Sequence, residues 1–189
     1  MGRIIVTEDV SLDGVMEDNG IWASEFERGK EGDQFKLDET HDAEVLLMGR
    51  VTYQLFASAW PSEEGELADK LNGMPKYVVS STLKEATWNN SRILRGDVVE
   101  NVSHLRQEIG GNIVVHGSAR LMQTLIEHDL IDELRLMVYP VVLGTGKRLF
   151  GDRSDKKRLR LADSKTVGDG IAILIYELAG GKAKGAISD

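Results

Sequence analysis

The chain contains no cysteine, which excludes disulfide bonds, thiolate metal sites and cysteine nucleophiles. It has only three prolines and no uninterrupted apolar segment near the roughly 20 residues that a membrane-spanning helix needs. The N-terminal residues lack the apolar core of a secretory signal. Basic residues are also outnumbered, since 23 Lys and Arg face 31 Asp and Glu. Because nucleic-acid binding needs clustered Lys and Arg, we expect no nucleic-acid partner. The lack of a signal and of a membrane span leads us to expect a cytoplasmic protein that binds a small molecule and no membrane.

Several catalytic motifs are missing as well. The four histidines show no HExxH spacing, so we expect no metal site, and no G-x-S-x-G elbow supports a hydrolase. The segment "VVLGTGKRLFG" is rich in glycine, but it fits neither the phosphate-loop pattern nor the GxGxxG dinucleotide fingerprint. A glycine turn that lines a ligand at Gly144 remains open.

Apolar strands and helices alternate along the chain. Three apolar runs, "EVLLM", "KYVV" and "NIVV", each precede small or hydroxyl residues and then a helix or loop. This alternation predicts an α/β fold with a mainly parallel, twisted sheet and flanking helices. We expect helices over 51–60, 62–72, 97–109 and 119–128, a loop and a shallow helix over 24–43, and an antiparallel strand pair joined at Asp169-Gly170. We predict one domain over 1–179 and a flexible tail over 180–189.

The carboxyl ends of the predicted strands carry the candidate ligand-binding residues. Ligands of open parallel sheets bind at this edge, and glycine at a helix N-terminus lets an anion approach free backbone amides. An arginine there adds a guanidinium that pairs with phosphate oxygens. Tight turns, a serine N-cap and ordinary turn-forming hydroxyls are the alternative interpretation. The candidates are Gly49, Arg50, Thr52, Ser80, Ser81, Gly117, Ser118 and Ala119.

The segment "SLDG" holds the first candidate acid, Asp13. Asp-Gly is also one of the strongest turn dipeptides, so a purely structural role stays open.

Taken in order, "SLDG", "LLMGRVTY", "YVVSS", "VVHGSARLMQTLIEHDLIDELRL" and "YPVVLGTGKRLF" are similar to one family. The chain resembles stand-alone members of the dihydrofolate reductase-like superfamily, specifically the reductase domain at the C-terminus of the bifunctional riboflavin-biosynthesis deaminase-reductase. The resemblance covers about residues 3–178 and is most specific from 117 to 134. It implies a single-domain dihydrofolate reductase-like fold, an NADPH cofactor and a homodimer.

The resemblance also implies roles for individual residues. Gly49, Arg50 and Thr52 match the segment that contacts the cofactor phosphates, with Arg50 near the adenosine 2′-phosphate. Ser80 and Ser81 match the adenosine end, and Gly117, Ser118 and Ala119 match the pyrophosphate turn. The matches on the nicotinamide and substrate side are Ser11, Asp13, Gly14 and Trp22.

These matches predict an NADPH-dependent reductase that transfers hydride to a C=N or C=O carbon of a small heterocyclic or ribosylamino substrate. The relation is to 5-amino-6-(5-phosphoribosylamino)uracil reductase, although "TYQLFASAWP" replaces that family's Asp-Pro and downstream arginine. We expect Asp13, with a pKa raised by apolar neighbours, or a bound water to supply the proton. The alternatives are pteridine reduction, for which Glu25 and Glu27 are nearby acids, and a non-enzymatic dimeric nucleotide sensor.

Overall fold

The computed structural model describes residues 1–151 and 156–178; the predicted tail over 180–189 lies outside the described residues. Eight strands form one sheet in the order β4-β3-β2-β5-β1-β6-β8-β7. The first six are parallel, and β8 runs antiparallel to both β6 and β7. This confirms the predicted mainly parallel sheet with an antiparallel C-terminal pair. The strands are β1 (Arg3–Ser11), β2 (Ala43–Gly49), β3 (Lys76–Val79), β4 (Ser91–Leu94), β5 (Asn112–His116), β6 (Glu133–Tyr139), β7 (Leu159–Val167) and β8 (Ile171–Leu178).

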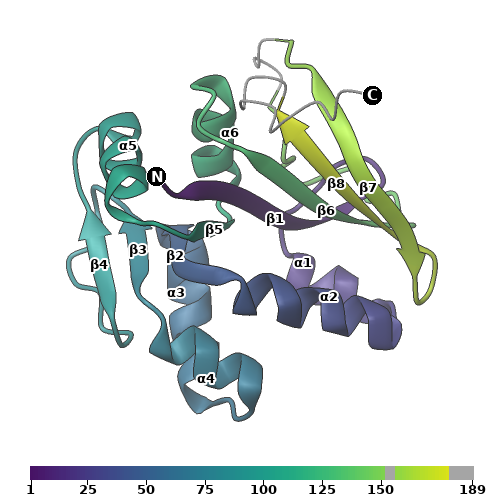
Figure 1. The fold of residues 1–189 in the computed structure, drawn as a ribbon. Helices are drawn as coiled ribbons and strands as arrows, with labels where there is room; N and C mark the ends of the chain where they lie inside the picture. The colour runs from purple at the N-terminus through teal and green to yellow at the C-terminus, as the bar shows by residue number, and fades with distance from the viewer. Residues whose placement is uncertain (152–155, 179–189) are drawn as a thin grey trace, which may run out of the picture.

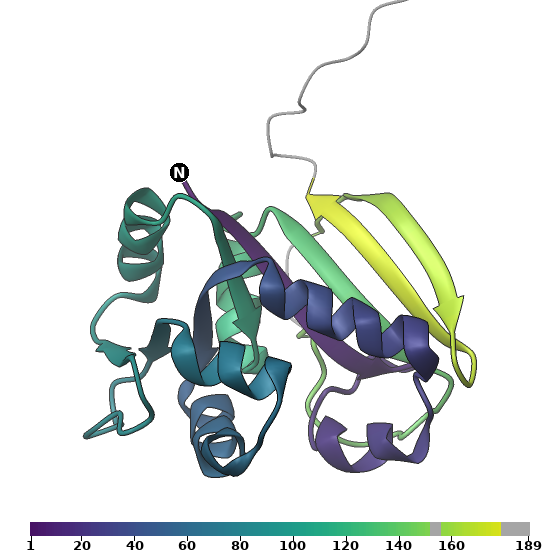
Figure 2. The ribbon, with the colours of Figure 1, turned by 60° about the horizontal axis from the view of Figure 1, so that its bottom comes forward.

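Helices cover both faces of the sheet. Helices α5 and α6 lie on one face and α2, α3 and α4 on the other (Figure 1), and the second group comes forward when the molecule is turned (Figure 2). The helices are α1 (Asn19–Trp22), α2 (Gly29–His41), α3 (Arg50–Ala59), α4 (Glu66–Gly73), α5 (Val98–Glu108) and α6 (Ala119–Glu127), with 3-10 turns η1 (Ala23–Glu25) and η2 (Trp60–Ser62).

The central strand β1 supplies side chains to both layers. Ile4 and Val6 pack in the cluster that includes α5 and α6, whereas Ile5 packs in the cluster that includes α3 and α4. Successive strand residues point to opposite faces, and a sheet covered on both sides therefore needs continuous apolar strands. The same alternation decides where the polar residues at the end of β1 point.

Local signals mark the starts of two helices, α5 and α4. Asp97 caps α5, as expected, because its side chain accepts a hydrogen bond of 2.8 Å from the Glu100 amide. Helix α4 begins after Gly65, whose φ is 107°, and not at Ser62 as expected. Helix α2 fills most of the segment for which a loop and a shallow helix were expected. Its Gly32 lies close to β7, since a Cβ there would be 3.2 Å from Val167 Cγ2.

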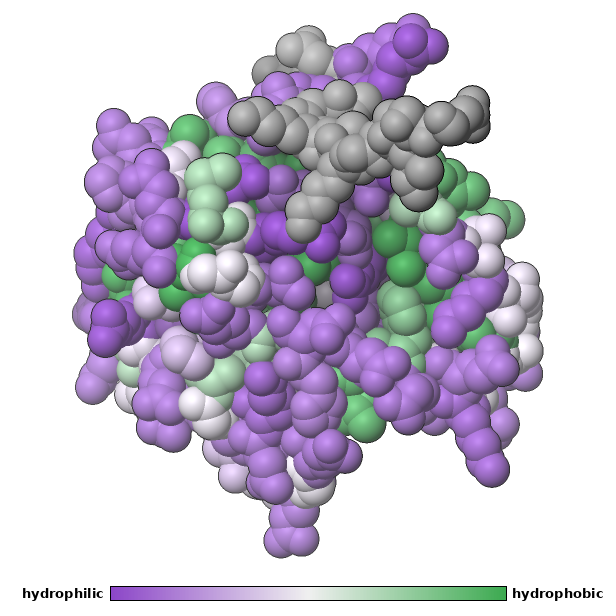
Figure 3. Space-filling view, in the orientation of Figure 1, coloured by the Kyte–Doolittle hydropathy of each residue, from purple (hydrophilic) through white to green (hydrophobic). Residues whose placement is uncertain are grey.

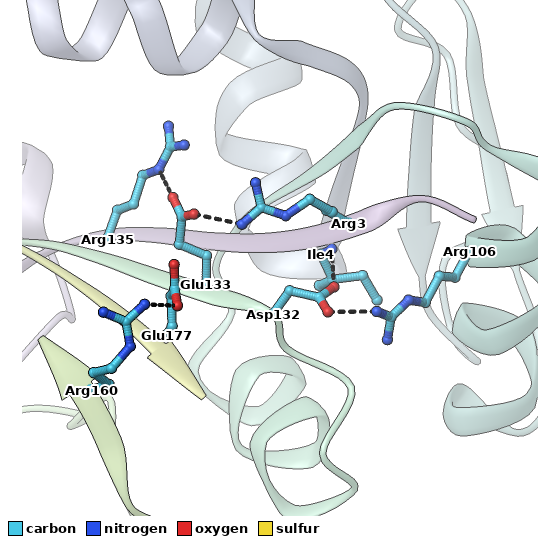
Figure 4. Close-up of polar contacts among 8 residues, drawn as sticks. All are labelled: Arg3, Ile4, Arg106, Asp132, Glu133, Arg135, Arg160 and Glu177. Carbon is cyan, nitrogen blue, oxygen red and sulfur yellow. Dashed lines mark hydrogen bonds and ion pairs between the residues drawn. The ribbon is translucent and has the colours of Figure 1, made fainter. Parts of the chain in front are cut away.

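Ion pairs fix the amino ends of β1 and β6, opposite the edge where the parallel strands end (Figure 4). Asp132 accepts a hydrogen bond of 2.8 Å from the Ile4 amide and pairs with Arg106 of α5. Beside it, the Glu133 carboxylate lies 2.8 Å from the Arg3 guanidinium. These contacts hold β1 in register against β6.

The face of the molecule seen in Figure 3 is mostly hydrophilic, and its hydrophobic residues form small separate patches. Within the described ranges, no helix has the length and apolar character needed to cross a membrane.

Candidate functional site

Two strand-to-helix junctions interlock at the carboxyl edge of the sheet. Gly49 ends β2 and precedes α3, and Ser118 precedes α6 in the same extended conformation. The Gly49 amide donates a hydrogen bond of 3.3 Å to the Gly117 carbonyl. A Cβ on Gly49 would lie 2.5 Å from Ser118 Oγ, and one on Gly117 would collide with Thr52 Oγ1. Both glycines are therefore required by close packing, and the two helix N-termini lie side by side.

The first turns of these two helices suit an anion. Neither contains an acidic residue, and each carries an arginine instead, Arg50 in α3 and Arg120 in α6. Free amides at a helix N-terminus favour negative charge, so cations at this position are unfavourable unless an anion is close by. Arg50 is exposed and donates a hydrogen bond of 2.9 Å to Gln54 Oε1 on its own helix.

The predicted serines follow the neighbouring strand. Val79 at the end of β3 pairs with Gly49, which brings the turn at Ser80 next to the first junction. The Ser80 hydroxyl is buried and accepts hydrogen bonds from the amides of Thr82 and Leu83, at 3.2 and 2.9 Å. Ser80 thus braces the turn, while Ser81 is exposed.

A groove of about 490 Å³ adjoins the second junction. It lies between the start of α6 and the loop over 146–151. Its lining includes Ala119, Arg120, Lys147 and Arg148. The groove thus begins at Ala119, in the turn that the sequence offered as a candidate anion site, and has basic residues on both sides.

The "SLDG" turn is tied to this same loop region. The Ser11 hydroxyl donates a hydrogen bond of 2.7 Å to Asp13, and the Asp13 carboxylate accepts from the amides of Leu143 and Gly144, at 3.1 and 2.9 Å. Arg148 lies 3.5 Å from the same carboxylate. The Gly144 amide is thus one of the groups that hold the Asp13 carboxylate, and Gly144 itself has a left-handed φ of 78°.

These donors correct one expectation. The Ser11 hydroxyl first, and then the two amides, lower the pKa of Asp13 well below its usual range. The raised pKa expected for a proton donor is wrong for this group, because polar donors and not apolar side chains surround it. Asp13 is ionised near neutral pH, and its visible role is to brace the turn.

A cluster of buried polar residues under α2 was missed by the sequence analysis. The Lys36 ammonium lies 2.9 Å from Asp9 Oδ1 and 3.4 Å from Glu39 Oε2. The other Glu39 oxygen accepts a hydrogen bond of 2.7 Å from the Thr7 hydroxyl. Arg28 Nε donates to the buried Tyr139 hydroxyl at 2.8 Å. Two spacings in the sequence could have indicated this cluster. Thr7 and Asp9 are two residues apart and share one strand face, and Lys36 and Glu39 are three residues apart and share one helix face.

Burial and charge set the protonation of this cluster. Burial opposes the charge on Lys36, but Asp9 and Glu39 raise its pKa above the usual value. Burial likewise opposes ionisation of Asp9, yet Lys36 and Arg28 lower its pKa overall. His116, the last residue of β5, has its pKa lowered to about 3 by burial and is neutral. The cluster thus contains charges whose states are fixed near neutral pH.

Trp22 lies beside this cluster. Its indole donates a hydrogen bond of 2.8 Å to the Glu17 carbonyl, and its ring meets Tyr139 edge-on with centroids 5.5 Å apart. The structure therefore brings the predicted residues together in two groups. The junction group holds Gly49, Arg50, Thr52, Ser80, Ser81, Gly117, Ser118 and Ala119, and the turn group holds Ser11, Asp13 and Gly144, with Trp22 packed against Tyr139. In the described part of the chain, no three acidic or histidine side chains are grouped to hold a metal ion.

Known proteins share this architecture. The chain is 30% identical to "Uncharacterized protein YyaP" of Bacillus subtilis (strain 168), over 94% of this chain and 96% of that protein. A solved structure assigned to riboflavin biosynthesis, from Shewanella sp. PV-4, matches with a TM-score of 0.78 and 22% identity, over 93% of this chain and 98% of the other.

A dihydrofolate reductase from Enterococcus faecalis, solved with NADP(H), matches with a TM-score of 0.63 and 15% identity, over 94% of this chain and 96% of the enzyme. The likeness to these structures establishes a dihydrofolate reductase-like fold. The model of the RibD C-terminal domain matches residues 3–173. The chain belongs to the RibD C-terminal domain family.

Proposed function

We propose that this protein is an NADPH-dependent reductase that transfers hydride to a C=N or C=O carbon of a small heterocyclic or ribosylamino substrate. The observation that carries the proposal is the interlocked pair of junctions at Gly49 and Gly117, where a Cβ on either residue would collide with the other junction. That arrangement would present two helix N-termini to one ligand, which suits the diphosphate of a dinucleotide. Family membership supports the same assignment.

Different junction residues would contact different parts of the cofactor. The amides after Gly117 and those of the first turn of α3 would hold the diphosphate, and Arg50 would contact the adenosine 2′-phosphate through its guanidinium. Ser81 has an exposed side chain, and its hydroxyl would contact the adenosine end. When bound, the cofactor supplies the hydride, and the protein orients it and excludes water.

The substrate end of the site would lie between Asp13 and the cluster under α2. The ionised Asp13 would keep the turn at Gly144 in place, and Trp22 would form part of the wall. Asp9 is ionised, and its side chain is 13% exposed, so it can accept hydrogen bonds from N–H groups of a heterocycle. Proton delivery falls to a water molecule, because Asp13 does not hold a proton near neutrality.

Cofactor choice tests the proposal. Loss of one charge-assisted contact costs about 1.5–3 kcal/mol, so Arg50→Ala should weaken NADPH about 10- to 150-fold and leave NADH nearly unchanged. Arg92→Ala, which removes an exposed arginine on β4, is the matched control. Equal weakening of both dinucleotides would remove Arg50 from this role.

A thermal shift measures binding directly. Ligand at a hundred times its dissociation constant adds about 2.7 kcal/mol, and each kcal/mol raises the melting temperature by about 2–4 °C at this size. Absence of any shift with NADPH and NADH would refute the proposal. Loss of nicotinamide absorbance with panels of pteridines and ribosylaminouracils then separates the reductase from a sensor that binds the cofactor without turnover.

A further inference from the structure

Glu8 contacts the cofactor turn from inside the protein. Val6 pairs with Val115 across β1 and β5, so two residues later Glu8 is level with Gly117. Glu8 is 5% exposed, and its Oε1 accepts a hydrogen bond from the Gly117 amide. The carboxyl therefore occupies the Gly117 amide from inside the protein, and the first amides of α6 have no partner within their own helix, as at any helix N-terminus.

We propose that Glu8 is a positioning residue for the cofactor diphosphate and that it acts by holding the Gly117 amide in place. This inference rests on the proposed function, because it assumes that the turn at Gly117 binds a diphosphate. Glu8 would contact the turn and not the ligand itself. The inference predicts that cofactor binding is coupled to uptake of a proton by Glu8 at alkaline pH.

The surroundings of Glu8 favour the protonated form. Burial raises the pKa of Glu8 to about 8, and the Gly117 hydrogen bond opposes this only in part. On its own strand Asp9 adds negative charge, and from α2 the carboxylate of Glu39 does the same while Lys36 opposes them. A neutral acid can accept the amide hydrogen bond without placing a negative charge beneath a bound anion.

The remaining elements around Glu8 add no charge that would ionise it. On β5, His116 is neutral because its pKa is lowered to about 3. On β6, the residue level with Glu8 is Leu136. The first turn of α6 contains Arg120, which is exposed. The charge of a bound diphosphate would thus be the strongest new influence, and it would favour the proton on Glu8 further.

The consequence is a defined pH dependence. With Glu8 protonated, affinity is at its full value, and above the pKa of the free protein it falls by up to about tenfold per pH unit until the pKa of the complex is reached. Glu8→Gln keeps the oxygen that accepts from Gly117 and removes the charge. This variant should bind NADPH with little pH dependence and more tightly than wild type at alkaline pH.

The test is calorimetric titration of NADPH into the wild type, Glu8→Gln and the control Glu108→Gln, from about pH 7 to about pH 9.5. Glu108 is an exposed acid at the end of α5. We expect the wild type and the control to lose at least about threefold in affinity over this range, with proton uptake visible in buffers of different ionisation enthalpy. The Glu8→Gln titration should stay flat. Equal pH profiles in all three proteins would overturn the role of Glu8.

A second measurement needs no cofactor. The carboxyl ¹³C signal that is absent from Glu8→Gln belongs to Glu8. It should titrate near pH 8 in the free protein, and NADPH should move the midpoint of that titration to a higher pH. Titration below about pH 5 would overturn the inference even if NADPH binds. Absence of NADPH binding to the wild type and to Glu8→Gln at every pH would refute the proposed function itself, and that outcome is distinct from binding with equal pH profiles.

Discussion

Replacement of Gly117 by alanine probes the interlocked junctions most directly. Gly117 has a φ of 46°, a left-handed conformation that costs a residue with a Cβ about 1–2 kcal/mol. The new Cβ would also collide with Thr52 Oγ1, and overpacking of this kind costs about 1–3 kcal/mol. Gly117→Ala should therefore lose about 2–5 kcal/mol of unfolding free energy. The melting temperature should fall by about 4–20 °C.

A double-mutant cycle separates the two costs. Thr52→Ala removes Oγ1 and leaves Thr52 Cβ at 3.3 Å from the added atom, so the double variant should recover about 1–3 kcal/mol of the loss. Gly73→Ala is the control, because a Cβ there has no neighbour within 4 Å and that variant should be as stable as wild type. Urea unfolding provides the free energies. Additive effects of the two substitutions would refute the proposed contact.

The buried cluster and the titratable groups give three more predictions. Lys36→Met leaves Asp9 with one fewer cation and should cost about 3–5 kcal/mol in urea unfolding, whereas Lys30→Met on the exposed part of α2 should cost little. Because the folded pKa of His116 is lowered to about 3, stability should fall as the pH drops from about 6.5 toward 3, and His116→Phe should reduce that loss in thermal melts. The lowered pKa of Asp13 stabilises the protein above the unfolded pKa of about 3.9, so Asp13→Asn should lower the melting temperature at pH 7 and differ less from wild type as the pH falls below that value.

The fold and the junction residues were accessible from the sequence because local chemistry specifies them. The apolar run before Gly49 is typical of a strand buried on both faces, and Asp97 is a helix cap in both sequence and structure. The C-terminal strand pair around Asp169-Gly170 is a local hairpin. What the sequence could not give is the contact between Gly117 and Thr52, since it joins segments 65 residues apart (117 minus 52).

The charged residues were harder to interpret for a physical reason. Lys36 and Glu39 lie in a polar segment that predicts a solvated helix, but their partners Asp9 and Thr7 come from the distant strand β1. Asp13 was expected among apolar neighbours, but its partner amide at Leu143 lies 130 residues away. Protonation states depend on such long-range donors, which no local pattern contains.

The ion pairs at the amino end of β1 have a consequence at its far end. Glu8 and Asp9 are adjacent, so they point to opposite sides of the sheet, one toward the α6 turn and one toward α2. A slip of β1 by a single position would turn both side chains to the opposite face of the sheet, so neither acid would keep its present surroundings. The Asp132 contact with the Ile4 amide sits five residues upstream of Asp9, roughly 16 Å along an extended strand. Disruption of that distant anchor would therefore misdirect both acids at once, without altering any atom that a ligand touches.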